Sequence, residues 1–281
     1  MPKIKPDQII VVANKHKNIA GIEISYKRYG KGTPVLCFPP WPSSSLVFLP
    51  LITLLQNDFE FIAFDMPGWG GYSGSMNQKP TIDNYSQIAA DFINLFKFKN
   101  YHIIGYSFGG MIAANAIKKG LLKPEKMIFA SSLYSGHEIY KRYEQQIKRY
   151  EKLKNLGVPD WFMKEVFKSF VRWKLPNYSY FPEYKNTKLF KQFLKEDFMA
   201  DFGSIVGLLT TLNEPVDFVG EKFKPKSLVI YADSDPEYIK TQSKELVKRL
   251  KAKELVVKDA DHNHFVFDIE KSEKQMKDFL A

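Results

Sequence analysis

The amino-acid sequence predicts an α/β fold, with a mostly parallel central sheet, helices on both of its faces and an inserted helical cap. Short apolar runs alternate with amphipathic stretches from Gly21 to Leu133, and the same alternation resumes near the C terminus. The block between these two halves has a different composition, rich in lysine and aromatic residues. A chain of 281 residues is long enough for one large α/β domain that carries such an insertion.

The first half contains the expected start of the sheet. Its strands are short runs of β-branched, aromatic and other apolar residues, at 22–29, 34–38, 59–65, 101–106 and 126–131. Its helices have apolar residues at helical spacing, at 45–55, 83–96 and 109–119. After a first hairpin-like pair, strands that alternate with helices imply crossover connections, and therefore parallel strands.

The second half continues the sheet after the insertion. Strands are expected at 226–232 and 253–259, and helices at 238–251 and 269–280. The α/β core is therefore expected to comprise residues 1–135 and 201–281.

Residues 136–200 are expected to form the helical cap, or lid. They contain fourteen Lys and Arg, eight Asp and Glu, and fifteen aromatic residues, with helix-like runs at 138–155 and 161–175. The helices of a cap bury one face, and that face often borders a substrate cleft. A separate small domain is the alternative interpretation of this block.

Composition excludes several classes of protein. Hydrophobic residues make up 44% of the chain and charged residues 26%, unlike disordered or fibrous proteins. No apolar run approaches the ~20 residues that span a bilayer, and polar residues interrupt the N-terminal apolar stretch, unlike a signal peptide. The single cysteine, Cys37, lies in an apolar run and is expected to be a buried structural thiol. We therefore expect a cytoplasmic protein.

The net charge of +10 raises the question of nucleic-acid binding. Only five of the 41 basic residues are arginine, whereas bidentate contacts to phosphate and guanine favour arginine. A lysine-biased composition explains the charge more simply, so no nucleic-acid partner is expected. A weak contact with a membrane surface is the other partner class that the charge allows.

The sequence Gly-Tyr-Ser-Phe-Gly at residues 105–109 stands between an expected strand and an expected helix. A sharp strand-to-helix turn brings two backbones close together, so Gly105 and Gly109 leave room that side chains would fill. Ser107 then presents its hydroxyl at the turn, next to the free N–H groups of a helix N-terminus. This pattern predicts a nucleophile. A glycine-rich turn that merely packs tightly is the alternative.

A serine nucleophile needs a base to take its proton and a carboxylate to orient that base. Two acids, Asp233 and Asp235, follow the strand at 226–232. We favour Asp235, because Pro236 biases it towards an extended conformation that presents the carboxylate beyond the strand end. Asp233 is the alternative acid.

Two histidines, His262 and His264, follow the strand at 253–259, and we favour His262 as the base. The His-Asn-His spacing with Asp259 and Asp261 also permits a metal site, because imidazole and carboxylate suit zinc. The remaining histidines are scattered along the sequence, so nothing completes such a cluster. No metal and no cofactor are therefore expected.

Together these residues resemble the α/β-hydrolase superfamily, in which nucleophile, acid and base follow the chain order of Ser107, Asp235 and His262. The stretch Asp65 to Gly74 is similar to the family's Asp-x-Pro-Gly-x-Gly turn after the fourth strand. The helix expected at 45–55 resembles the one after the family's third strand. The resemblance covers nearly the whole chain outside the cap and implies a serine hydrolase that works without a cofactor.

One loop departs from the family pattern. Where relatives usually carry His-Gly-x-Pro, this chain has Pro39, Pro40, Trp41 and Pro42. Proline has no N–H group, so Pro39 and Pro40 cannot donate to an oxyanion. The resemblance maps the family's oxyanion donor onto the backbone N–H of Trp41, and a second donor onto that of Phe108. A plain packing aromatic is the alternative role of Trp41.

The expected function is hydrolysis of a carboxylic ester, or a related acyl bond, of a small, largely apolar substrate through an acyl-enzyme. A serine at the nucleophile position argues against the epoxide hydrolases and haloalkane dehalogenases of the superfamily, which use aspartate there. Two alternatives are a ligand-binding protein that turns over slowly or not at all, and a lipid or thioester hydrolase that acts at membrane surfaces. The prolines favour the first of these, and the basic cap favours the second.

Overall fold

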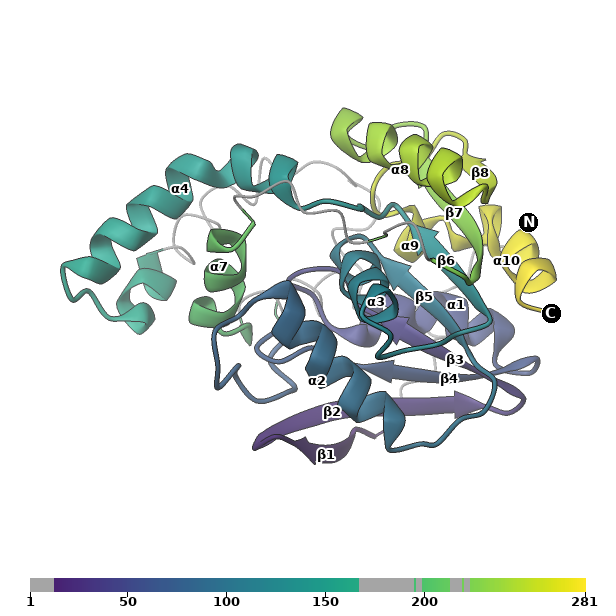
Figure 1. Ribbon diagram of the computed structural model, residues 1–281, viewed down its shortest axis with the longest axis horizontal. Helices are drawn as coiled ribbons and strands as arrows, with labels where there is room; N and C mark the ends of the chain where they lie inside the picture. Colours follow the sequence, from purple (N-terminus) through teal and green to yellow (C-terminus); the bar gives the residue numbers. More distant parts are fainter. Residues whose placement is uncertain (1–12, 167–194, 196–198, 213–218, 220–222) are drawn as a thin grey trace.

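The structure is a computed structural model, and it describes residues 13–166, 195, 199–212, 219 and 223–281 (Figure 1). One eight-stranded sheet has the strand order β1-β2-β4-β3-β5-β6-β7-β8. Strand β2 is antiparallel to both of its neighbours, and the pairs from β4 through β8 are parallel. The strands are β1 (Lys15–Ile19), β2 (Ile22–Gly30), β3 (Thr33–Phe38), β4 (Phe59–Phe64), β5 (His102–Tyr106), β6 (Lys126–Ala130), β7 (Lys226–Ala232) and β8 (Lys253–Val257).

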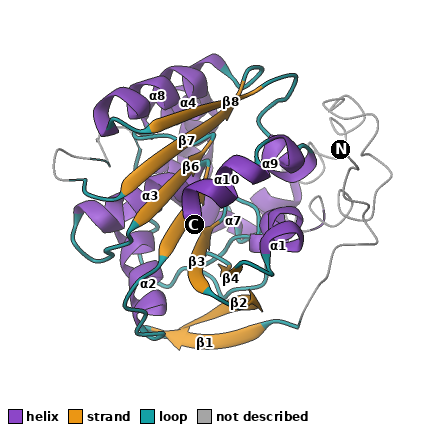
Figure 2. Cartoon of the chain, turned by 90° about the vertical axis from the view of Figure 1, so that its right-hand side faces the viewer, coloured by secondary structure: helices purple, strands orange, loops and turns teal. Residues whose placement is uncertain are grey.

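Helices cover both faces of this sheet, which confirms the predicted fold class (Figure 2). The helices with bounds in the described residues are η2 (Ser45–Phe48), α1 (Leu49–Leu55), α2 (Ile82–Asn94), α3 (Phe108–Lys118), α4 (His137–Asn155), α7 (Phe202–Thr210), α8 (Glu237–Leu250), α9 (His264–Phe267), η4 (Ile269–Lys271) and α10 (Glu273–Leu280). Both η elements are short 3₁₀ helices.

The core consists of two apolar layers, one on each side of the sheet. Successive residues of β3 alternate between them: Leu36 and Phe38 belong to the layer under α2, α3 and α8, whereas Val35 and Cys37 belong to the layer under α1, α9 and α10. This alternation is the two-residue period of a strand, and burial on both faces explains why β3 is a continuous apolar run. Cys37 is completely buried, as predicted, and burial raises the pKa of its thiol.

Two expected helices are divided in the structure. The helix expected at 45–55 begins as the 3₁₀ turn η2, capped by Ser44, and α1 starts only at Leu49, with Pro50 in its first turn. Pro50 has no N–H to donate back along a continuous α-helix, so the first turn tightens instead. The closing helix, expected at 269–280, is η4 followed by α10, because the backbone of Ser272 leaves the helical region at φ −130°.

The long helix α4 matches the first helix expected in the cap, and Figure 1 shows it beside α7, away from the sheet. The rings of Tyr150 on α4 and Phe202 on α7 are 5.6 Å apart. The second expected cap helix, at 161–175, is described only as far as residue 166, where the chain is helical, and the rest lies outside the described residues. The cap boundaries at 136 and 200 stay predictions.

Candidate active site

Ser107 occupies a sharp turn between β5 and α3. Its backbone has φ 50° and ψ −120°, a conformation that is strained for any residue other than glycine. The turn requires the glycines that flank it. A Cβ atom on Gly105 would lie 2.3 Å from Cα of Gly110, and one on Gly109 would lie 2.2 Å from the carbonyl oxygen of Phe38. The predicted steric reason for the Gly-x-Ser-x-Gly pattern therefore holds.

Hydrogen bonds on both sides hold this strained turn in place. The N–H of Ser107 donates to the carbonyl of Ala130 at 2.8 Å, and the hydroxyl of Ser132 donates to the carbonyl of Ser107 at 2.7 Å. The side chain of Ser107 is half-buried, and its Oγ makes no hydrogen bond with the described part of the chain. A catalytic hydrogen bond that is loose without substrate commonly tightens when substrate binds.

Asp235 and His262 are brought together by the ends of β7 and β8. His262 Nδ1 lies 2.7 Å from Asp235 Oδ1, with the Asp235 side chain fully buried and the imidazole 30% exposed. The neighbouring Tyr106 connects this pair to the serine turn. Its hydroxyl donates to the carbonyl of His262 at 2.6 Å, and its ring centroid lies 5.7 Å from that of the imidazole. Tyr106 directly precedes Ser107 in the chain.

The carboxylate of Asp235 accepts two further hydrogen bonds on its other oxygen. The hydroxyl of Ser131 donates to Oδ2 at 2.6 Å, and the N–H of Ala232 donates to the same atom at 2.8 Å. Burial alone would raise the pKa of Asp235, but the bonds from His262, Ser131 and Ala232 outweigh it and hold the pKa below its ordinary value. Asp235 is therefore a carboxylate at neutral pH.

Ser131 is a site residue that the sequence analysis missed. It follows β6, the strand between those that carry Ser107 and Asp235. The only sequence indication is its position, because a small polar residue at the carboxyl end of a central parallel strand faces the same edge as the nucleophile.

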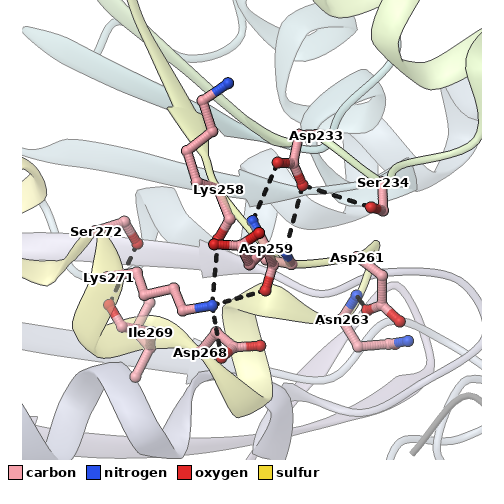
Figure 3. A network of polar contacts seen from close by, with 11 residues as sticks. Asp233, Ser234, Lys258, Asp259, Asp261, Asn263, Asp268, Ile269, Lys271 and Ser272 are labelled. Atoms are coloured by element: carbon pink, nitrogen blue, oxygen red, sulfur yellow. Dashed lines mark hydrogen bonds and ion pairs between the residues drawn. The ribbon is translucent and has the colours of Figure 1, made fainter.

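Asp233, the alternative acid, has a different role. Its carboxylate accepts hydrogen bonds from the N–H groups of Asp259 at 3.0 Å and Ala260 at 3.3 Å, and so fastens the loop that leads to His262 (Figure 3). On the other side of that loop, Lys271 donates to the carbonyl of Asp259 at 2.7 Å and pairs with Asp268 at 3.3 Å. The histidine loop is thus held from two sides.

His264, the alternative base, lies behind the acid and is completely buried. Its Nε2 is 3.0 Å from Ser131 Oγ, and burial lowers the pKa of its imidazole to about 4. The two histidines thus face different partners. Among the residues that the structure describes, no group of three or more His, Cys, Asp or Glu is placed to hold a metal ion.

The loop after β3 lies directly against the serine turn. A Cβ atom on Gly109 would lie 2.5 Å from the carbonyl oxygen of Pro39, and the Trp41 and Phe108 rings are 6.2 Å apart between centroids. Within this loop the N–H of Ser43 closes a turn onto the carbonyl of Pro40 at 2.9 Å. Phe108 is the first residue of α3, so no helical carbonyl precedes its N–H. The loop that carries Trp41 therefore lies against the turn that carries Ser107 and Phe108.

An aromatic cluster adjoins this loop. The Tyr143 ring on α4 lies 6.3 Å from the Trp41 ring, so α4 and the loop after β3 meet beside the serine turn. Arg142, the preceding residue of α4, stacks over the ring of Tyr238 on α8 at 5.8 Å.

Within the described residues, no helix is long and apolar enough to cross a membrane.

Comparison with known proteins places this geometry in a family. The sequence profile described as alpha/beta hydrolase fold matches residues 33–271. A human serine hydrolase-like protein is 34% identical over 95 residues, which are 32% of this chain and 45% of that protein. The chain therefore spans less than half the length of this curated relative.

Solved structures are similar over almost the whole chain. An esterase from Exiguobacterium antarcticum has a TM-score of 0.75 at 16% identity, over 95% of this chain and 99% of that one. A thermophilic esterase from Thermogutta terrifontis has a TM-score of 0.71 at 15% identity, over 96% and 98%. At these identities the likeness shows the fold. With a family profile that spans β3 to η4 and a strand order to match, this chain belongs to the α/β-hydrolase fold family.

Proposed function

We propose that this chain is a serine hydrolase that cleaves a carboxylic ester, or a related acyl bond, of a small and largely apolar substrate. The observation that carries the proposal is the 2.7 Å contact between Asp235 and His262, at the same sheet edge as the strained turn of Ser107. A nucleophile, a base and a buried carboxylate in this arrangement make up the machinery of acyl transfer. The serine hydrolase-like relatives and esterase structures support the same reaction class.

In the proposed first step, Ser107 Oγ attacks the acyl carbonyl while its proton passes to His262 Nε2. Because Nδ1 of His262 donates to Asp235, Nε2 is the nitrogen that accepts. The N–H groups of Trp41 and Phe108 then stabilise the oxyanion of the tetrahedral intermediate. When this intermediate collapses, the bond to the leaving oxygen breaks and that oxygen takes the proton from Nε2.

In the second step, water attacks the acyl-enzyme, and Nε2 accepts a proton from the water and returns it to Ser107. Asp235 stays ionised throughout and stabilises the imidazolium that forms twice in each cycle. The hydrogen bonds that lower the pKa of Asp235 support this role. The rings of Trp41, Phe108 and Tyr143 support an apolar acyl group, because they pack against one another beside the turn of Ser107.

The test is hydrolysis of short and medium p-nitrophenyl esters by the wild type, Ser107→Ala and a matched control. The control, Ser243→Ala, removes another buried serine hydroxyl, which lies on α8 and has no hydrogen-bond partner among the described residues. We expect Ser107→Ala to retain less than about 10⁻³ of the wild-type kcat, and Ser243→Ala to remain active. A folded wild type that hydrolyses no ester of any chain length would refute the esterase proposal and favour the ligand-binding alternative.

A membrane-surface hydrolase is a second candidate, favoured by side chains at the far end of α4. Leu156, just after α4, is 71% exposed, and Trp161, in the next helical segment, is 68% exposed. Lys152 and Lys154 lie in the last turn of α4. An exposed apolar group among lysines suits an anionic lipid surface. This candidate predicts that anionic vesicles raise the activity and that salt reverses the effect, because salt screens surface charge. A soluble esterase predicts no response to vesicles.

A further inference from the structure

His264 is a buried titratable side chain that the proposed mechanism does not use. It is the first residue of α9, it has no exposed surface, and its Nδ1 has no hydrogen-bond partner within the described residues. A buried imidazole without full hydrogen bonding is costly. Its other nitrogen lies 3.0 Å from Ser131 Oγ, which in turn lies 2.6 Å from Asp235 Oδ2.

The directions of these hydrogen bonds follow from elementary chemistry. A carboxylate only accepts hydrogen bonds, so the single hydroxyl proton of Ser131 points at Asp235. Ser131 Oγ then accepts from His264, which must carry its own proton on Nε2. The unpartnered Nδ1 is accordingly the unprotonated nitrogen of a neutral ring. The low pKa of His264 agrees, since burial disfavours the imidazolium.

The surroundings of His264 keep this arrangement fixed. The ring of Phe265 packs at 6.2 Å and also stacks on Tyr106 at 5.2 Å, so the apolar packing continues to the residue before the serine turn. The titratable groups that act on the imidazole are Asp235, His262, Asp268 and Lys271. Asp268 and Lys271 pair with each other at 3.3 Å, which limits their net effect on His264.

We propose that Ser131 and His264 are positioning residues that hold Asp235 in the one rotamer that presents Oδ1 to His262. This inference rests on the proposed function. Ser131 fixes the second carboxylate oxygen, and His264 fixes the hydroxyl rotor of Ser131, so the hydrogen bonds run in one direction from His264 through Ser131 to the acid. His264 therefore acts only through Ser131 and touches no reacting atom.

The hydrogen bond from Ser131 also changes how strongly the Asp235 carboxylate interacts with His262. The hydrogen bond from the Ser131 hydroxyl stabilises part of the negative charge of the Asp235 carboxylate. Without that bond, the carboxylate attracts a proton on His262 more strongly. The protonated imidazole is then more stable, so the form of the enzyme that can accept a proton from Ser107 is lost at a higher pH. Asp261, another acid on the histidine loop, stays in place in every variant and cannot produce the change. The acidic limb of the profile of kcat/KM against pH is therefore the readout.

The experiment compares Ser131→Ala, His264→Leu and the double variant with the wild type. Ser131→Ala loses a hydrogen bond to a charged group, so kcat should fall by about tenfold to a hundredfold with KM unchanged. The acidic limb should move up by as much as about one pH unit. His264→Leu loses a neutral hydrogen bond and should lower kcat by about threefold to tenfold. The double variant should be no slower than Ser131→Ala, because His264 has lost its target.

Two further variants separate positioning from packing. His264→Gln can place an amide N–H near the Nε2 position, so it should recover most of the kcat that His264→Leu loses. His102→Leu replaces another buried histidine with an unpartnered Nδ1, at the start of β5, and should leave kcat and the pH profile unchanged. Equal kcat in His264→Leu and the wild type, or losses that multiply in the double variant, would overturn the proposal.

The outcome is distinguishable from a failure of the proposed function. If the folded wild type hydrolyses no ester, the proposed function fails. NMR of the ¹⁵N-labelled imidazoles can still test whether Ser131 holds Asp235 against His262. We then expect the hydrogen-bonded Nδ1 proton of His262 to exchange faster with water in Ser131→Ala than in the wild type. An unchanged exchange rate would overturn the positioning proposal by itself.

Discussion

Replacing Asp235 by asparagine is the sharpest perturbation of the candidate site. Oδ2 of Asp235 accepts from two fixed donors, the hydroxyl of Ser131 and the N–H of Ala232. In Asp235→Asn the single amide oxygen must serve those two donors, which turns the amide NH₂ group towards His262. The NH₂ group then donates to Nδ1, so the proton of His262 moves to Nε2. An Nε2 that carries a proton cannot accept one from Ser107.

The size of the effect follows from this change of tautomer. The variant keeps the bonds to Ser131 and Ala232, so the fold should survive and only the chemistry should suffer. Loss of the correct tautomer in a serine triad lowers kcat by about 10⁴. That factor corresponds to about 5 kcal/mol of transition-state stabilisation. The assay is kcat for a p-nitrophenyl ester at pH 7 to 9, with circular dichroism to establish folding.

Asp233→Asn is the matched control, two residues away. Its carboxylate accepts from two backbone N–H groups of the histidine loop and from the hydroxyl of Ser234 at 3.5 Å. In the variant an amide oxygen still accepts from one of those N–H groups. We expect kcat of Asp233→Asn within about threefold of the wild type, since the loop keeps one of its two bonds and Lys271. A folded Asp235→Asn that keeps a tenth of the wild-type kcat would refute the assignment, as would equal losses in the two variants.

Three further outcomes are expected. Gly109→Ala should lower the free energy of unfolding by about 2 kcal/mol or more, because its Cβ would lie 2.2 Å from the Phe38 oxygen. Gly120 has open space around it, so Gly120→Ala should lower the free energy of unfolding by only about 1 kcal/mol, because of its positive φ. Equal losses for the two variants in urea denaturation would contradict this reasoning. His264 has a pKa of about 4 in the fold and 6.5 in the unfolded chain, so its stabilisation is present above pH 6.5 and is lost as the pH falls towards 4. Urea titrations should show that the free energy of unfolding falls by up to about 3 kcal/mol over this pH range. The fall should be smaller in His264→Gln. Cys37 should react with a thiol reagent only at the rate of unfolding, and fast labelling of the native protein would contradict its burial.

Much of the fold could be predicted from the sequence because local patterns have local causes. The continuous apolar run of β3 reflects burial on both faces, and the glycines beside Ser107 reflect contacts shorter than any side chain allows. Strand β1 was not expected as a separate element, because four of its five residues are exposed and it has no apolar periodicity. Only its antiparallel pairing with β2 makes it a strand.

The remaining part of the site depends on contacts between residues that are far apart in the chain. Ser131 and Asp235 are 104 residues apart, and Ser131 and His264 are 133 apart, so no motif joins them. In the sequence alone, nothing distinguishes Ser131 and His264 from a surface serine and a packing histidine. Their meaning appears only when β6 and β7 become neighbours in the sheet.

The sheet itself explains why a serine is needed at that position. Each of three adjacent strands donates one hydrogen bond beyond its last paired residue: Ser107 to Ala130, Ser131 to Ile230, and Asp233 to Val257, at 2.7 to 3.0 Å. Neighbouring strands lie ~4.8 Å apart, so the ends of β5 and β7, which precede Ser107 and Asp235, are separated by about 10 Å. In the sheet, β6 lies between these two strands. A side chain at the end of β6 therefore faces a buried carboxylate, and an apolar residue there would leave one oxygen of Asp235 with a single donor, the N–H of Ala232. The hydroxyl of Ser131 supplies the second donor, which accounts for a short hydroxyl side chain at the end of β6.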